Sequence, residues 1–425
     1  MTTAATAFGD LKVVDCDAHF TEPADLWTSR APKAMRDRVP VQRTRDGMTK
    51  WYLDGELWAS IGGNTIAAGA QKVLGTNSVQ PFEAVDPAAW DPAARLALMD
   101  RVGIHAQVLY PNGIGFSSNH IFAVDDLEQR VAILRMYNDF LVDVQRQGRG
   151  RLFPQALLPI WDMDLTVAEM TRLVDQGITG FTLSDRPELL GLGELADPYF
   201  EPMWDLFDQS GTVANFHIGS GARKEEMERA RARYSHRAGR AAPSEPASPA
   251  TPEVPTVAEP AWSSFDRQRS LAVTSALMYM SNARIVANLC MSNLFDRHPG
   301  LKIVSAESGI GWVPFVLEAL EYQLDEMVTE ADERSFQQRR PTDYFRDHMY
   351  VTFWFEKVAP RKLLADVGIG NVLVETDIPH ATCLFPDPAA HFAAAFDGVE
   401  PEVRRRVLQD NAAELYGISL DGVGR

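Results

Sequence analysis

The chain contains the stretch Leu11-Lys12-Val13-Val14-Asp15-Cys16-Asp17-Ala18-His19, in which acidic and histidine side chains interrupt an apolar run. Residues two apart on a β-strand share one face. One face therefore carries Asp15, Asp17 and His19, and the apolar residues between them form the other. In a βα barrel the outer face of a strand packs on helices, so we expect the polar face to point inward. Asp17 and His19 then lie nearest the C-terminal rim, where barrel enzymes carry out their chemistry.

Further along the chain, short runs rich in Val, Ile and Leu alternate with amphipathic stretches, which predicts an α/β protein built from βα units. The predicted strands are 11–19, 106–110, 155–159, 180–184, 213–217, 301–307, 350–353 and 372–377. The predicted helices include 92–102, 127–147, 165–176, 311–327 and 401–415. Eight strands are the number in a (β/α)8 TIM barrel. A doubly wound open sheet is the alternative, but the glycine-rich fingerprint that follows its first strand is absent.

The chain is longer than such a barrel needs. It has 425 residues, whereas a barrel typically takes about 250, so we expect a single barrel domain over 1–425 with insertions. The first insertion, 36–88, follows strand 1 and contains Asp54-Gly55 between apolar flanks, which predicts a tight β-hairpin. The second, 222–262, follows strand 5 and is charged, then proline-rich, with six prolines in 241–260. A lid, an oligomerisation arm and a disordered insertion are alternatives for it.

Composition excludes several classes of protein. There are 41 Lys and Arg against 58 Asp and Glu, a net charge of −17, which argues against a nucleic-acid binder. No apolar run reaches the about 18 residues of a membrane span. The first residues carry no secretion signal, and three cysteines are too few for a disulfide framework. We therefore expect a cytoplasmic protein with a small-molecule substrate and no nucleic-acid or membrane partner.

Three later strands also end in side chains that can bind a metal. His217 ends the fifth predicted strand, Glu307 the sixth and Asp377 the eighth, with Glu375 two residues before Asp377. By the same two-residue rule, Glu307 shares a face with Ile303. If these strands and the first belong to one barrel, their rim brings five carboxylates close to two imidazoles.

Such a group of carboxylates needs a compensating positive charge. Unpaired buried carboxylates are costly, and neighbouring ones raise one another's pKa. No lysine or arginine occupies these strand ends. One divalent cation is the simplest compensation, and mixed histidine and carboxylate ligands suit Zn²⁺, Mn²⁺ or Fe²⁺ better than Ca²⁺. The sequence therefore predicts a metal site.

Each of these residues also has a structural interpretation, because single strand-end histidines and turn aspartates usually have no ligand. Their joint placement at strand ends favours the metal site. Asp15 and Glu375 lie one layer deeper, so we expect them to orient the ligands. Glu22 and His380 directly follow strands, where an orienting role and an ordinary loop position are alternatives.

At these residues the sequence resembles a known family. The motifs are Asp15-Cys16-Asp17-Ala18-His19-Phe20-Thr21-Glu22-Pro23, Phe216-His217-Ile218-Gly219 and Thr376-Asp377-Ile378-Pro379-His380, with supporting stretches at 99–104, 137–140 and 295–299. Together they resemble the motifs of the amidohydrolase-related family, a part of the amidohydrolase superfamily. Aminocarboxymuconate semialdehyde decarboxylase is one of its best-known members. The resemblance runs from about Val13 to Tyr416 and is specific to the family, not to a substrate.

The resemblance implies a distorted (β/α)8 barrel with one divalent metal, Zn²⁺ or Mn²⁺, and a dimer or larger homo-oligomer. It assigns the metal ligands to Asp17, His19, His217 and Asp377. Decarboxylases of the family usually have a histidine at the position of Glu307, and the arginine that they use for a substrate carboxylate is absent here.

Three functions remain open at this point. The first is non-oxidative decarboxylation of an aromatic or unsaturated acid, with Asp377 as proton donor to carbon and Glu307 as the alternative donor. Arg223 is a candidate clamp for the anionic substrate, with a solvated linker charge as the alternative. The second is hydrolysis or hydration, in which Glu307 or Asp377 takes a proton from metal-bound water. The third is a non-catalytic barrel that binds a ligand, and the intact His19, His217 and Asp377 argue against it.

Overall fold

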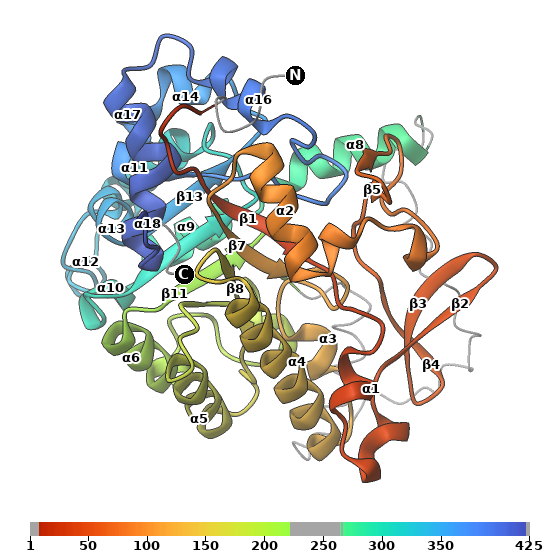
Figure 1. Ribbon diagram of the computed structural model, residues 1–425. Coiled ribbons are helices and arrows are strands. Elements are labelled where there is room, and N and C mark those ends of the chain that lie inside the picture. Colours follow the sequence, from red (N-terminus) through yellow and green to blue (C-terminus); the bar gives the residue numbers. More distant parts are fainter. Residues whose placement is uncertain (1–7, 222–263, 265–266, 422–425) are drawn as a thin grey trace.

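The computed structural model describes residues 8–221, 264 and 267–421. Within them, nine strands form one sheet in the order β8-β7-β1-β14-β13-β12-β11-β10-β9, and every neighbouring pair is parallel. The strands are β1 (Val14–Phe20), β7 (Ala106–Pro111), β8 (Leu152–Pro154), β9 (Ala156–Leu157), β10 (Gly180–Thr182), β11 (Val213–His217), β12 (Lys302–Ala306), β13 (Met349–Phe353) and β14 (Val372–Val374). Helices cover this sheet from outside (Figure 1).

The two outermost strands of this order are consecutive in the chain. Only Gln155 separates β8 from β9, while β8 pairs with β7 and β9 pairs with β10. A further contact crosses the sheet, since the Tyr110 hydroxyl in β7 donates a hydrogen bond of 3.0 Å to Asn215 Oδ1 in β11. Because β7 and β11 are not neighbours, the sheet is curved and these side chains lie on its concave side.

The helices follow the strands along the chain, as expected for βα units. Their bounds are α1 (Leu26–Arg30), α2 (Pro92–Val102), α3 (Asn119–Phe122), α4 (Leu127–Gln147), α5 (Met163–Val174), α6 (Glu201–Ser210), α8 (Arg267–Met278), α9 (Ala283–Cys290), α10 (Leu294–Arg297), α11 (Val313–Met327), α12 (Ala331–Arg334), α13 (Pro341–His348), α14 (Ala359–Lys362), α15 (Leu364–Val367), α16 (Pro388–Ala395), α17 (Pro401–Arg405) and α18 (Asn411–Tyr416). The predicted helices 92–102 and 127–147 coincide with α2 and α4. The predicted helix 401–415 is divided into α17, a π-helical turn Arg406–Asp410 and α18.

Between β1 and α2 the chain forms small antiparallel sheets apart from the parallel sheet. β2 (Val41–Arg45), β3 (Met48–Leu53) and β4 (Glu56–Ser60) form one, at the right of Figure 1, and β5 (Ile66–Ala67) pairs with β6 (Gln71–Lys72). Asp54 and Gly55 connect β3 to β4 with φ values of 51° and 87°. Two positive φ values in a two-residue loop are typical of a type I′ hairpin, at the position where the sequence predicts one. The segment 222–262 and its Arg223 lie outside the described residues.

A β-bulge in β1 corrects the predicted face of Asp15. The pairing of β1 with β7 shifts register between Asp15 and Ala18, so the two-residue alternation does not hold across this point. Val14 and Cys16, before the shift, pack with Tyr110 on the concave side. Asp15 therefore points away from that side and is not on the same face as Asp17.

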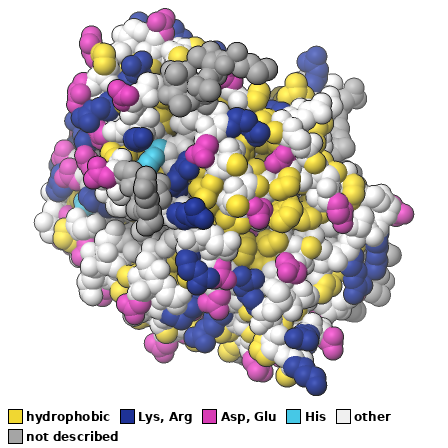
Figure 2. All heavy atoms as spheres, in the orientation of Figure 1, with side chains coloured by type: hydrophobic (Ala, Val, Ile, Leu, Met, Phe, Trp, Pro, Cys, Tyr) yellow, Lys and Arg dark blue, Asp and Glu magenta, His cyan; other side chains and the backbone are white. Residues whose placement is uncertain are grey.

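On the face of the molecule that Figure 2 shows, acidic and basic side chains are interspersed around a hydrophobic area. The net charge of −17 is therefore not gathered there as one acidic patch.

No helix in the described part of the chain is both long enough and apolar enough to cross a bilayer.

Candidate metal centre

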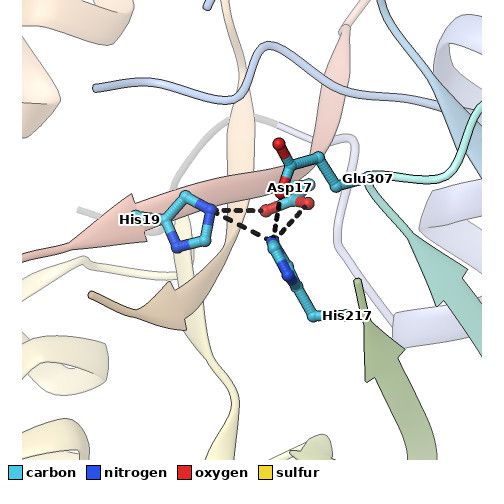
Figure 3. A group of neighbouring side chains, drawn as sticks. All are labelled: Asp17, His19, His217 and Glu307. Atoms are coloured by element: carbon cyan, nitrogen blue, oxygen red, sulfur yellow. Dashed lines mark hydrogen bonds and ion pairs between the residues drawn. The ribbon is translucent and has the colours of Figure 1, made fainter. Parts of the chain in front are cut away.

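Side chains from two strands and from the segments that follow two others meet at one point of the concave side. Asp17 and His19 come from β1, His217 is the last residue of β11, Glu307 directly follows β12, and Asp377 follows β14. Asp17, His19, His217 and Glu307 each offer a ligand atom within 4.8 Å of the others, and Figure 3 shows these side chains gathered together. His19, Glu307, Asp377 and His380 form a second, overlapping group. The structure thus brings together all four residues that the sequence analysis assigns as metal ligands.

The two imidazoles point their Nε2 atoms at each other, 3.2 Å apart. The Nδ1 atom of His19 lies 2.9 Å from the Pro111 carbonyl oxygen, and that of His217 lies 2.7 Å from the Ile218 carbonyl oxygen. A carbonyl only accepts hydrogen bonds, so each Nδ1 carries the proton and each neutral ring has its lone pair on Nε2. Two lone pairs directed at one point are the arrangement that a metal ion requires.

Carboxylate oxygens complete the group. From His217 Nε2, the distances are 3.2 Å to Asp17 Oδ2 and 3.1 Å to Glu307 Oε2. From His19 Nε2, they are 3.4 Å to Asp17 Oδ1 and 3.5 Å to Asp377 Oδ1. Both oxygens of Asp17 are buried and accept no hydrogen bond. Buried polar atoms without partners are rare. A divalent cation would be a partner for these oxygens and for the imidazole nitrogens at the same time.

Burial and mutual repulsion shift the protonation of these groups in opposite directions. Burial raises the pKa of Asp17 well above its usual value, and the nearby Asp377 charge raises it further. The pKa of Glu307 is raised in the same way, by burial and then by Asp377 and Asp17. Burial lowers the pKa of His217 to about 4 and that of His19 well below its usual value. Each shift favours the neutral form of the side chain, because a buried charge is costly. A bound cation would instead favour the ionised carboxylates.

The residues expected to orient the ligands occupy different places. Asp15 accepts hydrogen bonds from Thr376 N (2.7 Å), Thr376 Oγ1 (2.6 Å) and Gln107 Nε2 (2.7 Å), which ties β1 to its two neighbours. Glu375 accepts one from Glu307 N at 3.1 Å. Both therefore hold the strand ends rather than touch the imidazoles.

His380 and Glu22, the two loop residues, differ from each other. The His380 ring stacks on His19 with centroids 3.7 Å apart, and its Nδ1 lies 2.8 Å from Asp377 Oδ1. His380 is therefore part of the cluster. Glu22 is buried and accepts hydrogen bonds from Gly113 N (2.8 Å) and Asn112 N (3.3 Å). It fixes the loop after β7 and does not reach the imidazoles.

Two residues near the cluster are not predicted from the sequence. Arg95 of α2 is fully buried and donates a hydrogen bond of 2.6 Å to the His19 carbonyl oxygen. The Phe116 ring lies 3.9 Å from the His217 ring and 5.0 Å from the His19 ring, centroid to centroid. No motif marks either residue. Neither a single arginine in a helix nor a phenylalanine in a loop forms a sequence pattern that would predict contact with the two histidines.

A family profile described as amidohydrolase matches residues 14–418. The chain belongs to the amidohydrolase family. The chain is 26% identical over 335 residues to gamma-resorcylate decarboxylase of Rhodococcus jostii (strain RHA1), and the matched region covers 76% of this chain and 86% of that protein.

Solved structures of related proteins share its fold. An amidohydrolase from Mycobacterium avium subsp. paratuberculosis K-10 superposes with a TM-score of 0.65 at 18% identity, over 96% of this chain and 99% of that one. A dihydroxybenzoic acid decarboxylase from Polaromonas sp. JS666, solved with bound manganese and the inhibitor 2-nitroresorcinol, has a TM-score of 0.56 at 17% identity, over 96% and 97% of the two chains.

Proposed function

We propose that this amidohydrolase is a metal-dependent carboxy-lyase that removes CO₂ from an aromatic or unsaturated carboxylic acid without an oxidant. The observation that carries the proposal is that the Nε2 atoms of His19 and His217 lie 3.2 Å apart, and 3.4 Å and 3.2 Å from buried oxygens of Asp17 that accept no hydrogen bond. The similarity to a gamma-resorcylate decarboxylase along 86% of that protein supports the reaction class.

Asp17, His19, His217 and Asp377 would hold one divalent ion. Zn²⁺ is our first choice, and Mn²⁺ and Fe²⁺ suit the same ligands; the Polaromonas relative contains manganese. When bound, the ion supplies a Lewis acid that holds the substrate carboxylate and a neighbouring oxygen.

The protein's own carboxyls supply the proton. When the bond between the ring carbon and the carboxylate breaks, CO₂ leaves, and the electron pair that remains on carbon takes up a proton. Asp377 is our first candidate donor and Glu307 the second. Burial, with the charges of Asp377 and Asp17, raises the pKa of Glu307 well above its usual value, which favours the protonated form that a proton donor requires.

Hydrolysis or hydration is the second candidate function. It is favoured by the Glu307 carboxyl, whose Oε2 lies 3.1 Å from His217 Nε2, because a carboxylate in that place can take a proton from metal-bound water.

The fold and its assembly complete the proposal. We infer that the bent segment β8–β9 closes the sheet into a distorted (β/α)8 barrel that forms a single domain, 1–425, with 36–88 inserted after strand 1 and 222–262 inserted after strand 5. Assembly into a dimer or larger homo-oligomer and a cytoplasmic location stay predictions from the sequence.

The test combines metal content with CO₂ release. We expect purified protein to hold about one divalent ion per chain and to release CO₂ from 2,6-dihydroxybenzoate or 5-carboxyvanillate. His217→Ala and Asp377→Asn should lose both metal and turnover, whereas the matched controls His105→Ala and Asp397→Asn should keep both. Full metal content in His217→Ala and Asp377→Asn would contradict the ligand assignment. Metal with hydrolysis of esters or amides, and without CO₂ release, would favour the second candidate.

A further inference from the structure

The inserted region after β1 is bonded to the segment that carries Asp377. Thr65 N donates a hydrogen bond of 2.8 Å to the Pro379 carbonyl oxygen, and Thr65 Oγ1 donates one of 2.7 Å to the His380 carbonyl oxygen. Thr65 belongs to the inserted region 36–88, whereas Pro379 and His380 directly follow Asp377 and Ile378. The insertion therefore lies against the candidate metal centre.

The Asn112 side chain connects this region to the His380 ring. Its Nδ2 donates hydrogen bonds to Thr21 Oγ1 (2.8 Å) and to the Gly63 carbonyl oxygen (3.0 Å), which uses both amide protons. Its Oδ1 accepts a hydrogen bond of 2.8 Å from Gly63 N. These three bonds fix which end of the amide is the oxygen. His380 Nε2 lies 3.2 Å from that oxygen, so Nε2 carries a proton and donates it.

The other nitrogen of the ring meets Asp377. His380 Nδ1 lies 2.8 Å from Asp377 Oδ1, and the ring stacks on His19 with centroids 3.7 Å apart at 23°. Two atoms that both present lone pairs would repel at 2.8 Å, so one proton belongs to this contact and holds Oδ1. The second oxygen, Oδ2, accepts a hydrogen bond of 3.0 Å from Thr382 Oγ1. The two oxygens of Asp377 are therefore held by different residues.

Gly63 limits the space available to the His380 ring. A Cβ atom at Gly63 would lie 2.6 Å from His380 Cδ2 and 3.1 Å from Nε2. The φ of Gly63 lies outside the left-handed region, so the ring, and not the backbone, excludes a side chain there. The preceding Gly62 has φ of 77°, and its Cβ would overlap the Asn112 side chain. The ring is thus enclosed between Gly63, His19 and the Asn112 amide.

We propose that Asn112 and the Gly62-Gly63 turn of the inserted region are positioning residues of the metal centre. They set the His380 ring so that its Nδ1 keeps Asp377 Oδ1 beside His19 Nε2, where the ion would bind. This inference deepens the proposed function and rests on its metal site, but not on its reaction. It gives the insertion after β1 a role in the site, which no motif in that region indicates.

Metal affinity tests the contact of His380 with Asp377. His380→Phe keeps a ring that can stack on His19 but has no nitrogen, and it should weaken the binding of Zn²⁺ or Mn²⁺ about tenfold, as expected for a group that holds a ligand. His380→Asn places an amide donor where Nδ1 lies and should bind within about threefold of the original protein. The control His105→Phe, at the opposite end of β7 from Asn112, should bind metal normally.

Three results would overturn this role of His380. One is unchanged affinity in His380→Phe, and another is an equal loss in His380→Phe and His380→Asn. The third is complete loss of the ion from His380→Phe, which would make His380 itself a ligand.

A double-mutant cycle tests the part of the inserted turn. Gly63→Ala should weaken metal binding about tenfold, because the new methyl group displaces the ring. It should add nothing in a His380→Ala background, where the ring is gone. The control Gly370→Ala, at an exposed position with no atom within 4 Å of its Cβ, should leave the affinity unchanged. Additive losses, or no effect of Gly63→Ala in the original protein, would overturn the role of the turn.

The same cycle in thermal unfolding, with a chelator present, needs no metal. Gly63→Ala should lower the Tm of the original protein but not that of His380→Ala, whose missing ring leaves room for the methyl group. Such coupling without any metal bound by the original protein would contradict the proposed metal site, and with it the role of His380 toward the ion. Metal binding without coupling in either measurement would overturn this inference and leave the proposed function standing.

Discussion

Two residues beside the metal centre have a backbone conformation that residues other than glycine rarely adopt. Glu307 has φ of 52° and Asp377 has φ of 57°, in the left-handed region that costs a side chain about 1–2 kcal/mol. Neighbours hold them there, since Asp377 N donates to the Asp17 carbonyl oxygen at 2.9 Å and Glu307 N donates to Thr352 Oγ1 at 2.9 Å. Such strain is concentrated at functional sites, and here it turns both carboxyls toward the imidazoles.

A histidine far from this site is expected to control part of the pH dependence of stability. His348 is buried, its Nδ1 lies 2.9 Å from the Leu301 carbonyl oxygen, and its ring stacks on Phe295 with centroids 4.4 Å apart. Burial lowers its pKa below the usual value. The unfolded chain therefore binds a proton at this position at a pH where the folded protein does not, so His348 lowers the stability as the pH falls below about 6.5.

The measurement is the free energy of unfolding in denaturant at about pH 7 and about pH 5. We expect His348→Asn, which keeps a donor near the Leu301 carbonyl, to lose less stability over this interval than the original protein does. The difference between the two pH series isolates this residue from the other histidines. Parallel series would contradict the assignment.

At the scale of elements, Arg95 joins α2 to the strands that carry the site. It donates to the His19 carbonyl oxygen at 2.6 Å, to the Ala88 carbonyl oxygen at 2.5 Å and to Gln107 Oε1 at 3.1 Å. Burial lowers the pKa of Arg95 to about 10, so its charge persists at neutral pH. Gln107 in turn donates to Asp15, which accepts from Thr376 and so links this arginine to the segment after β14.

Arg95→Leu should therefore lower the free energy of unfolding by about 3 kcal/mol or more, because it leaves buried acceptors without partners. It should also weaken metal binding, since the backbone of His19 loses its support. Arg101→Leu on the exposed side of the same helix is the control and should change stability by no more than about 0.5 kcal/mol. Denaturant unfolding and metal titration measure both effects, and equal stability of the two variants would refute the role of Arg95.

The elements also show which features the sequence can predict. All eight predicted strands overlap observed ones, and α2 and α4 have their predicted bounds, because alternating apolar runs and helix caps are local signals. The prediction that Asp15 shares a face with Asp17 is wrong, because a bulge in β1 interrupts the alternation of faces. No residue type in the sequence marks that bulge. The contact of Glu307 with His217 depends on a positive φ, which the alternation rule cannot predict. Arg95 depends on packing between elements and leaves no local signal at all.

At the scale of the whole molecule, the candidate metal centre joins segments that are far apart in the sequence. β1, β11 and the segment after β14 each contribute a ligand candidate. An ion bound there stabilises only the folded arrangement, since the unfolded chain does not bring these residues together. The same buried carboxylates repel one another without the ion, as the raised pKa of Asp17 and that of Glu307 indicate. We therefore expect this group of carboxylates to destabilise the metal-free protein and a bound ion to stabilise it.

Asp17→Asn should separate these two effects. With metal at 100 times its dissociation constant, the original protein should gain about 2.7 kcal/mol of stability, and the variant should gain little because it lacks a ligand. After treatment with a chelator the order should reverse, because the amide that replaces the Asp17 carboxylate carries no charge to be buried beside Asp377 and Glu307. The control Asp397→Asn, at an exposed position, should follow the original protein in both states. Thermal unfolding of the three proteins with chelator and with added Zn²⁺ or Mn²⁺ measures this reversal. If Asp17→Asn is the less stable protein without metal, the repulsion among the carboxylates does not control the metal-free state, and the charge argument for the site is wrong.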